Sequence, residues 1–128
     1  MTTAGEGRAM IENLNMKQLR AILNVIPLEL TVLDADNLVV YWNEARQQNG
    51  KIAASVRGSD VRECHSASSR PIVDKVIEDL RTGSHDCIEK RLPDRTISWR
   101  ALRDPDGHYL GALEVIQRFK QSSGAGGD

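Results

Sequence analysis

The sequence lacks the features of several large protein classes. Two cysteines are too few for a disulfide scaffold, and the longest apolar runs are far shorter than the about 20 residues of a membrane span. Aromatic residues make up only 4%, less than a base-stacking surface commonly uses, and the net charge of −1 gives no reason to expect nucleic acid or an anionic membrane as a partner. The N-terminus has no secretory layout, so we expect a cytoplasmic location with free thiols.

The composition is that of one ordinary soluble domain. Hydrophobic residues make up 40% and charged residues 27% of the 128 residues, enough to bury a core without disulfides or metals. We expect a disordered N-terminus over 1–9, an N-terminal helix over 10–26, a folded domain over 27–119 and a disordered tail over 120–128.

The N-terminal helix is predicted from the spacing of its apolar residues. Leu19, Ile22, Leu23 and Ile26 follow the i, i+3, i+4, i+7 pattern of an amphipathic helix, and Pro27 ends it. Two interpretations stay open: the apolar stripe covers the domain's own core, or it is an exposed dimerisation surface.

A β-hairpin follows the helix. Leu28–Leu33 and Leu38–Trp42 are rich in β-branched and aromatic residues, and a cluster of turn formers separates them. The polar segment 43–48 then predicts one or two helical turns. Strict alternation along the second strand predicts Val40 and Trp42 on one face and Val39 and Tyr41 on the other.

The best-marked helix is predicted over 72–82. Ser68 or Ser69 is a plausible N-cap, Pro71 fits the first turn, and Gly83 is placed to end the helix. Its apolar stripe is expected to comprise Ile72, Val73, Val76, Ile77 and Leu80.

The last third predicts three consecutive antiparallel strands, at 87–92, 95–102 and 108–119. A strong turn signal at 104–107 separates the last two, and Gly111 marks a bulge in the final strand. With one long helix between a hairpin and a meander, a doubly wound parallel sheet is disfavoured. We therefore predict an α+β fold, in which helices cover one face of a five-stranded antiparallel sheet.

Three local sequences resemble the PAS domain family. These are the second strand and its Asn-x-Ala continuation over 39–45, the Gly-x-x-Val segment at 58–61, and the Arg-Asp-x-x-Gly-x-x-x-Gly hairpin over 103–111. The Cys-His-x-x-x-Ser stretch before the central helix is similar to one branch, found in bacterial and archaeal proteins of unknown function, often beside hemerythrin-like modules. That branch commonly has Pro-Pro after the Cys-His pair, where this chain has Ser66-Ala67.

The resemblance, over about residues 20–119, implies a sensory or regulatory module rather than an enzyme. Such domains hold a small organic ligand between the sheet and the long helix, or mediate protein–protein contacts. We expect a homodimer, formed through the N-terminal helix and the sheet, and a signalling effector protein as a further partner.

The Cys64-His65 pair is the main chemical feature of the sequence. The resemblance places His65 near the position of a haem axial ligand, with Cys64 as an alternative, which would make the protein a haem-binding gas or redox sensor. A histidine that bonds backbone at the helix start or faces solvent is the favoured interpretation. Zinc bound by this pair together with His85 and Cys87 is disfavoured, since a helix of about 14 residues, about 21 Å long, separates the two pairs. Catalysis by Cys64 is also disfavoured, because no third residue is marked to orient a base.

Other candidate ligand contacts lie on the strands and at helix starts. Arg70, with Arg100 and Arg103, is suited to an anionic ligand or to ordinary ion pairs. The remaining candidates are strand residues that fit either a cavity wall or simple packing, together with the polar residue after the second strand: Tyr41, Trp42, Trp99 and Asn43.

Overall fold

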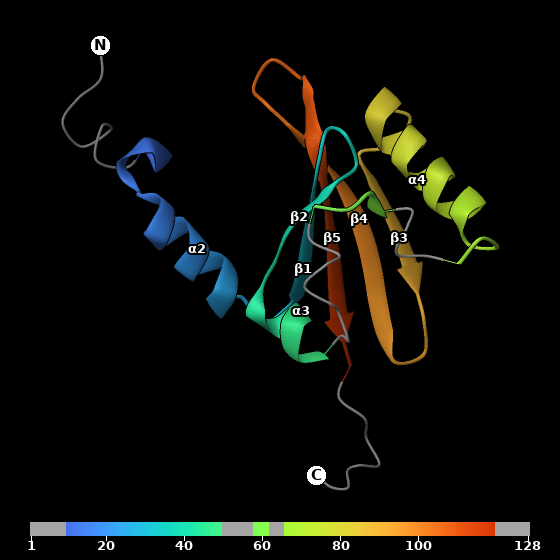
Figure 1. Cartoon of the computed structure of the whole chain (residues 1–128), viewed down its shortest axis with the longest axis horizontal. Helices are drawn as coiled ribbons and strands as arrows, with labels where there is room; N and C mark the ends of the chain where they lie inside the picture. The colour runs from blue at the N-terminus through green and yellow to red at the C-terminus, as the bar shows by residue number, and fades with distance from the viewer. Residues whose placement is uncertain (1–9, 50–57, 62–65, 120–128) are drawn as a thin grey trace, which may run out of the picture.

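The computed structural model describes residues 10–49, 58–61 and 66–119, and Figure 1 shows their arrangement. A short 3-10 helix η1 (Ile11–Asn13) precedes the helices α2 (Met16–Val25), α3 (Glu44–Asn49) and α4 (Arg70–Thr82). The strands are β1 (Glu29–Asp34), β2 (Val39–Trp42), β3 (Cys87–Arg91), β4 (Arg95–Arg103) and β5 (Tyr109–Arg118). No helix within the described ranges is both long enough and apolar enough to cross a membrane.

The five strands form one antiparallel sheet in the order β2-β1-β5-β4-β3, which confirms the predicted fold class. The last strand, β5, lies between β1 and β4, so it joins the N-terminal hairpin to the C-terminal meander. Helix α4 packs against β4 and β5, and α3 lies against β1. Helix α2 projects away from the sheet (Figure 1).

The core lies between the sheet and α4. Its buried members are Leu33, Val39, Trp42, Leu80 and Ala112. Leu33 pairs with Ala112 across β1 and β5, and Leu80 reaches this cluster from α4. We call the face of the sheet that carries these residues the inner face.

A β-bulge in β2 overturns one sequence-based prediction. Thr31 pairs with Trp42 and Leu33 with Val39, so two residues of β2 stand opposite one residue of β1. Because of the extra residue, Val39 lies on the same face of the sheet as Trp42, and both side chains are buried. Val40 is 42% exposed, so the prediction that it shares a face with Trp42 is wrong.

The two long helices differ in how well their sequences predicted them. Helix α4 begins after Ser69 and ends at Gly83 in the left-handed conformation, as expected, but the Ser69 side chain makes no capping hydrogen bond. Ile72 is 65% exposed rather than part of the buried stripe. The segment predicted as one N-terminal helix over 10–26 is instead divided. Asn15 forms a capping box with Gln18, which starts a new helix at Met16 and separates it from η1.

A second bulge lies beside Gly111. Leu102 pairs with Gly111 and Arg103 with Tyr109, which leaves Leu110 as the extra residue of β5. Gly111 has φ +150°, and a Cβ there would lie 2.1 Å from the carbonyl oxygen of Leu33. Glycine is therefore required by the close approach of β5 to β1.

Candidate functional site

An open pocket of about 220 Å³ lies where α2, β2 and α3 meet. Three of the residues predicted to contact a ligand line it, so the structure brings Tyr41, Trp42 and Asn43 together. The lining also includes residues from the ends of both helices, and the full set is Asn24, Tyr41, Trp42, Asn43, Glu44 and Gln47.

The side chain of Asn43, directly after β2, makes hydrogen bonds to α2, α3 and β1, and we call this set of bonds the joint. Its side-chain carbonyl oxygen accepts from the backbone N–H of Leu30 at 2.9 Å and of Arg46 at 3.2 Å. Its amide nitrogen donates to the carbonyl oxygens of Leu23 at 2.9 Å and Leu28 at 2.8 Å. One buried side chain thus caps the start of α3 and the end of α2, and fixes both to β1.

Asn24 ties α2 to the same region a second time. Its side-chain oxygen accepts from the Tyr41 hydroxyl at 2.7 Å and from the backbone N–H of Glu44 at 3.1 Å. Trp42, at the end of β2, donates its indole N–H to the side-chain oxygen of Gln47 on α3. The polar groups of the pocket are therefore engaged with one another, and they hold the end of α2 against β2 and α3.

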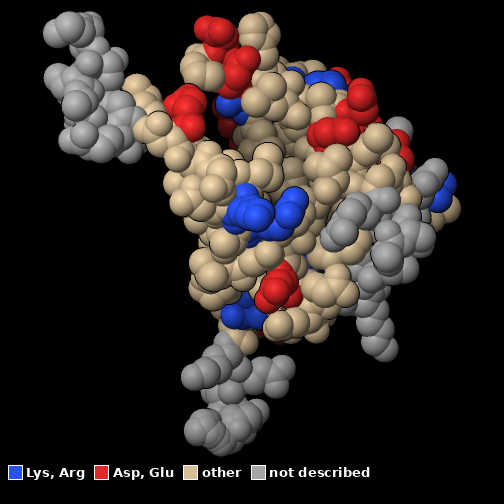
Figure 2. All heavy atoms as spheres, turned by 60° about the vertical axis from the view of Figure 1, so that its left-hand side comes forward, with Lys and Arg blue, Asp and Glu red and all other residues tan. Residues whose placement is uncertain are grey.

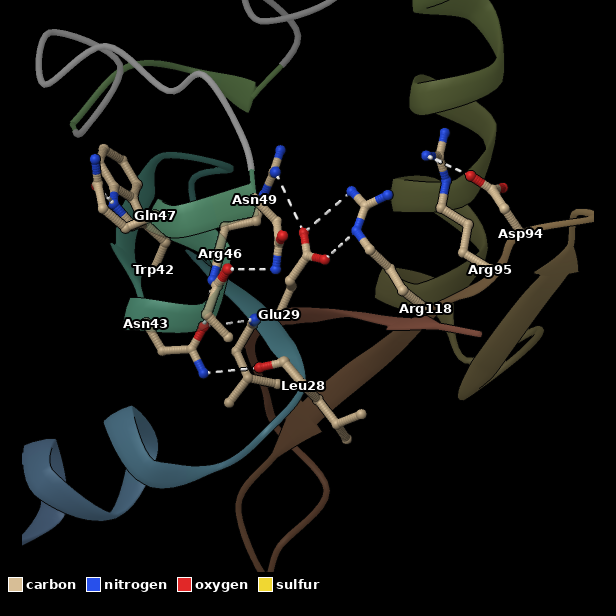
Figure 3. Close-up of polar contacts among 12 residues, drawn as sticks. Leu28, Glu29, Trp42, Asn43, Arg46, Gln47, Asn49, Asp94, Arg95 and Arg118 are labelled. Carbon is tan, nitrogen blue, oxygen red and sulfur yellow. Dashed lines mark hydrogen bonds and ion pairs between the residues drawn. The ribbon is translucent and has the colours of Figure 1, made fainter. Parts of the chain in front are cut away.

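Three arginines lie in a row near Glu29, at the start of β1, as Figure 3 shows. Glu29 is 3% exposed and accepts hydrogen bonds from Arg118, while Arg46 of α3 lies 3.5 Å from the same carboxylate. The hydrogen bond to Glu29 raises the pKa of the Arg118 guanidinium above its ordinary value. Arg95 stands directly opposite Arg118 in the sheet and lies 3.7 Å from Asp94. We call Arg46, Arg118 and Arg95 the basic row.

Trp99 lies elsewhere on the inner face. It pairs with Glu114 across β4 and β5, and its indole N–H donates to the Glu114 carboxylate at 3.1 Å. Glu114 also stands opposite Thr31. Trp99 therefore does not line the pocket that contains Trp42; it is partly buried and packs against the core cluster.

The remaining predicted residues are dispersed. Cys64 and His65 lie outside the described residues, so the haem and metal hypotheses for them stay predictions. Arg70 is the exposed first residue of α4. Arg103 is engaged in the fold, since it donates to Asp86, to the Gly107 carbonyl at 3.2 Å and to the Leu80 carbonyl at 2.5 Å.

One group of potential metal ligands forms the turn between β4 and β5. Asp104, Asp106 and His108 bring their ligand atoms within 4.8 Å of one another. The Asp104 carboxylate, however, accepts the backbone N–H groups of Asp106 and His108, each at 2.9 Å. The bond from His108 is the main cause that lowers the pKa of Asp104. This geometry is that of an Asx turn, which accounts for the cluster without a metal.

Sequence reasoning missed Tyr109 and the basic row. The Tyr109 hydroxyl is buried with no hydrogen-bond partner among the described residues, and the guanidinium carbon of Arg81 lies 4.9 Å from its ring centroid. Burial raises the pKa of this hydroxyl above its ordinary value. The basic row was missed because its members are far apart in sequence, and only the strand register brings them together.

Comparisons with known proteins agree with this architecture. The sequence model of the family described as "PAS domain" matches residues 19–120. The C-terminal domain of a Streptococcus mutans protein is 30% identical, with a TM-score of 0.75 over 88% of this chain and 90% of that chain. No curated protein matches the chain in sequence.

Two more distant solved structures share the fold. The PAS domain of a Colwellia psychrerythraea protein is 14% identical, with a TM-score of 0.62 over 81% of this chain and 96% of that chain. VqmA of Vibrio cholerae, solved bound to DPO, is 16% identical, with a TM-score of 0.54 over 84% of this chain and 59% of that chain.

Proposed function

We propose that this chain, which belongs to the PAS domain family, senses a small organic ligand on the inner face of its sheet and signals through α2. PAS domains are sensory and regulatory modules, and that general role applies to this chain. VqmA, which contains this fold, has been solved with a ligand and bound to DPO. The proposed role is binding and signalling, without a catalytic step.

The observation that carries the proposal is the position of α2. Within this helix, which the structure describes in full, no residue is buried, although its apolar residues follow an amphipathic pattern. Val25 is 76% exposed and Ile22 is 46% exposed. A helix of 10 residues is too short to be stable through its own hydrogen bonds alone, so it needs a surface to pack against.

A second copy of the chain is the partner that we propose for this surface. Figure 2, which turns the left-hand side of Figure 1 forward, shows uncharged surface on this face, divided by separate acidic and basic groups. Val40 of β2, which the bulge turns outward, adds apolar surface to the edge of the sheet. A homodimer formed through α2 and the neighbouring sheet would bury these residues.

The hydrogen bonds around Asn43 provide a route from the inner face to α2. Arg46, on the first turns of α3, contacts Glu29 on the inner face. Asn43 caps the same helix and holds the Leu23 carbonyl of α2. A ligand that displaces Arg46 would therefore shift α3, and with it the end of α2, so that ligand binding and helix packing are coupled.

Native mass spectrometry of the protein as isolated tests both parts of the proposal. We expect a dimer that carries additional mass from a retained small molecule, and release of that mass when the protein is denatured. A monomer without bound mass, even at high protein concentration, would contradict the proposal. The downstream effector would then be sought with the dimer as bait.

A further inference from the structure

We propose that the basic row is the subsite that anchors the carboxylate of a small organic acid. This inference rests on the proposed ligand-sensing function and adds the chemical class of the ligand. It is carried by an excess of positive charge, by guanidinium N–H groups without acceptors, and by an apolar wall beside them.

Among the residues that the structure describes, the charges of the row are not balanced by their neighbours. Arg95 and Arg118 are direct cross-strand partners, an arrangement in which like charges repel. The Glu29 carboxylate forms ion pairs with two arginines, Arg118 and Arg46. The second anion, Asp94, is half exposed and lies 3.7 Å from Arg95, so three positive charges face two negative ones.

Two donors in the row are left unused. The Nε–H groups of Arg46 and Arg95 are buried and have no acceptor in the part of the chain that the structure describes. Buried polar hydrogens in native proteins are nearly always paired, so these two call for an acceptor beyond the described residues. The oxygens of an anionic ligand would meet that need.

The geometry favours a carboxylate over a larger anion. A guanidinium presents a planar fork that matches the two oxygens of a carboxylate. Glu29 already places a carboxylate between Arg46 and Arg118 (Figure 3), so the row holds this group in the protein itself. We infer that the carboxylate of a ligand binds beside Glu29 and takes up the donors that Glu29 leaves free.

The body of the ligand would rest on isoleucine side chains. Ile97 and Ile116 pair with each other. Ile97 follows Arg95 by two residues and Ile116 precedes Arg118 by two, so both isoleucines face the same side of the sheet as the arginines. Ile116 is buried. A short aliphatic or aromatic acid combines the anionic end and the apolar body that this surface fits.

Calorimetric titration of the full chain tests the proposal with butyrate and benzoate, each compared with its neutral amide at constant ionic strength. We expect the acids to bind and the amides to bind at least tenfold more weakly. Arg46→Gln and Arg95→Gln should each weaken acid binding at least tenfold, whereas Arg91→Gln, an exposed position on β3, should not. Equal binding of acid and amide, or unchanged affinity in Arg46→Gln, would overturn the proposal.

Glu29→Gln provides a test with the opposite sign. It removes the internal counter-ion and leaves the arginines in place, so acid binding should become tighter; weaker binding would contradict the assignment. Inorganic phosphate is the comparison anion, and binding of phosphate alone would also overturn it. If no acid binds while native mass spectrometry still shows a retained neutral molecule, the subsite is wrong and the ligand-sensing function stands.

Discussion

The side-chain amide of Asn43 donates to the backbone carbonyl of Leu23 at 2.9 Å, which fixes the last turn of α2 to the start of α3. Because the same side chain also accepts from Leu30 and Arg46, its loss would leave several buried backbone groups without partners.

Asn43→Ala should destabilise the fold by about 3 kcal/mol or more, since each buried group left unpaired costs about 1–3 kcal/mol. The measurement is the free energy of unfolding from urea denaturation. Asn49→Ala is the matched control, because Asn49 is exposed and its side chain makes, among the described residues, a single bond within α3, to the Ala45 carbonyl. A loss in Asn43→Ala no larger than that of the control would show that Asn43 does not hold the joint.

The two tyrosines should respond in opposite ways to loss of their hydroxyl groups. Tyr109→Phe removes a buried hydroxyl that has no partner in the described ranges, so the free energy of unfolding should stay the same or rise. Tyr41→Phe removes the bond to Asn24 and should cost about 0.5–1.5 kcal/mol. Comparison of both variants by urea denaturation checks this, and a clear loss of stability in Tyr109→Phe would reveal a partner for its hydroxyl.

Burial of Tyr109 also predicts a pH dependence. Because its folded pKa is raised above the ordinary value of 10.0, the neutral form stabilises the fold below pH 10.0, and this contribution is lost as pH rises through the folded pKa. In the Tyr41→Phe variant, Tyr109 is the only tyrosine, so ultraviolet absorbance follows its ionisation directly. We expect a midpoint above 10.0; a midpoint at or below that value would mean that the hydroxyl is solvated.

Substitution of two apolar residues of α4 should have very different effects on the free energy of unfolding. Leu80 is 1% exposed at the centre of the core, and Leu80→Ala should cost about 2–5 kcal/mol. Ile72→Ala, on the same helix but largely exposed, should change stability by no more than about 0.5 kcal/mol. Thermal unfolding of the two variants separates them, and equal losses would indicate that the first turn of α4 is covered by another surface.

The order of the elements could be predicted because the relevant signals are local. Turn formers bound each strand, and Pro71 and Gly83 mark the ends of α4. The family could be recognised for the same reason, since its motifs are short and continuous in the sequence.

The bulge in β2 could not be predicted, because no glycine marks it and Val39 and Val40 are chemically identical. Only the pairing with β1 decides which of the two valines faces the core. Burial of the α2 stripe was equally undecided by periodicity, which shows that a helix has an apolar face but not what covers it.

The candidate site was predicted less well than the fold. Tyr41, Trp42 and Asn43 are neighbours in sequence and do meet at one pocket. The basic row joins Arg46, Arg95 and Arg118, which lie on three different elements and come together only through strand register and the placement of α3. Composition and motif spacing carry no information about such a cluster.

Light scattering of the full chain tests the central claim most directly, namely that α2 exists to pack against a second copy. We expect a dimer for the wild type and a monomer for Ile22→Glu, which places a charge on the exposed apolar side of α2. Arg20→Glu, on roughly the opposite side of the helix at about 100° per residue, is the control and should remain a dimer. A monomeric wild type at high concentration, or a dimer that Ile22→Glu leaves intact, would contradict the account.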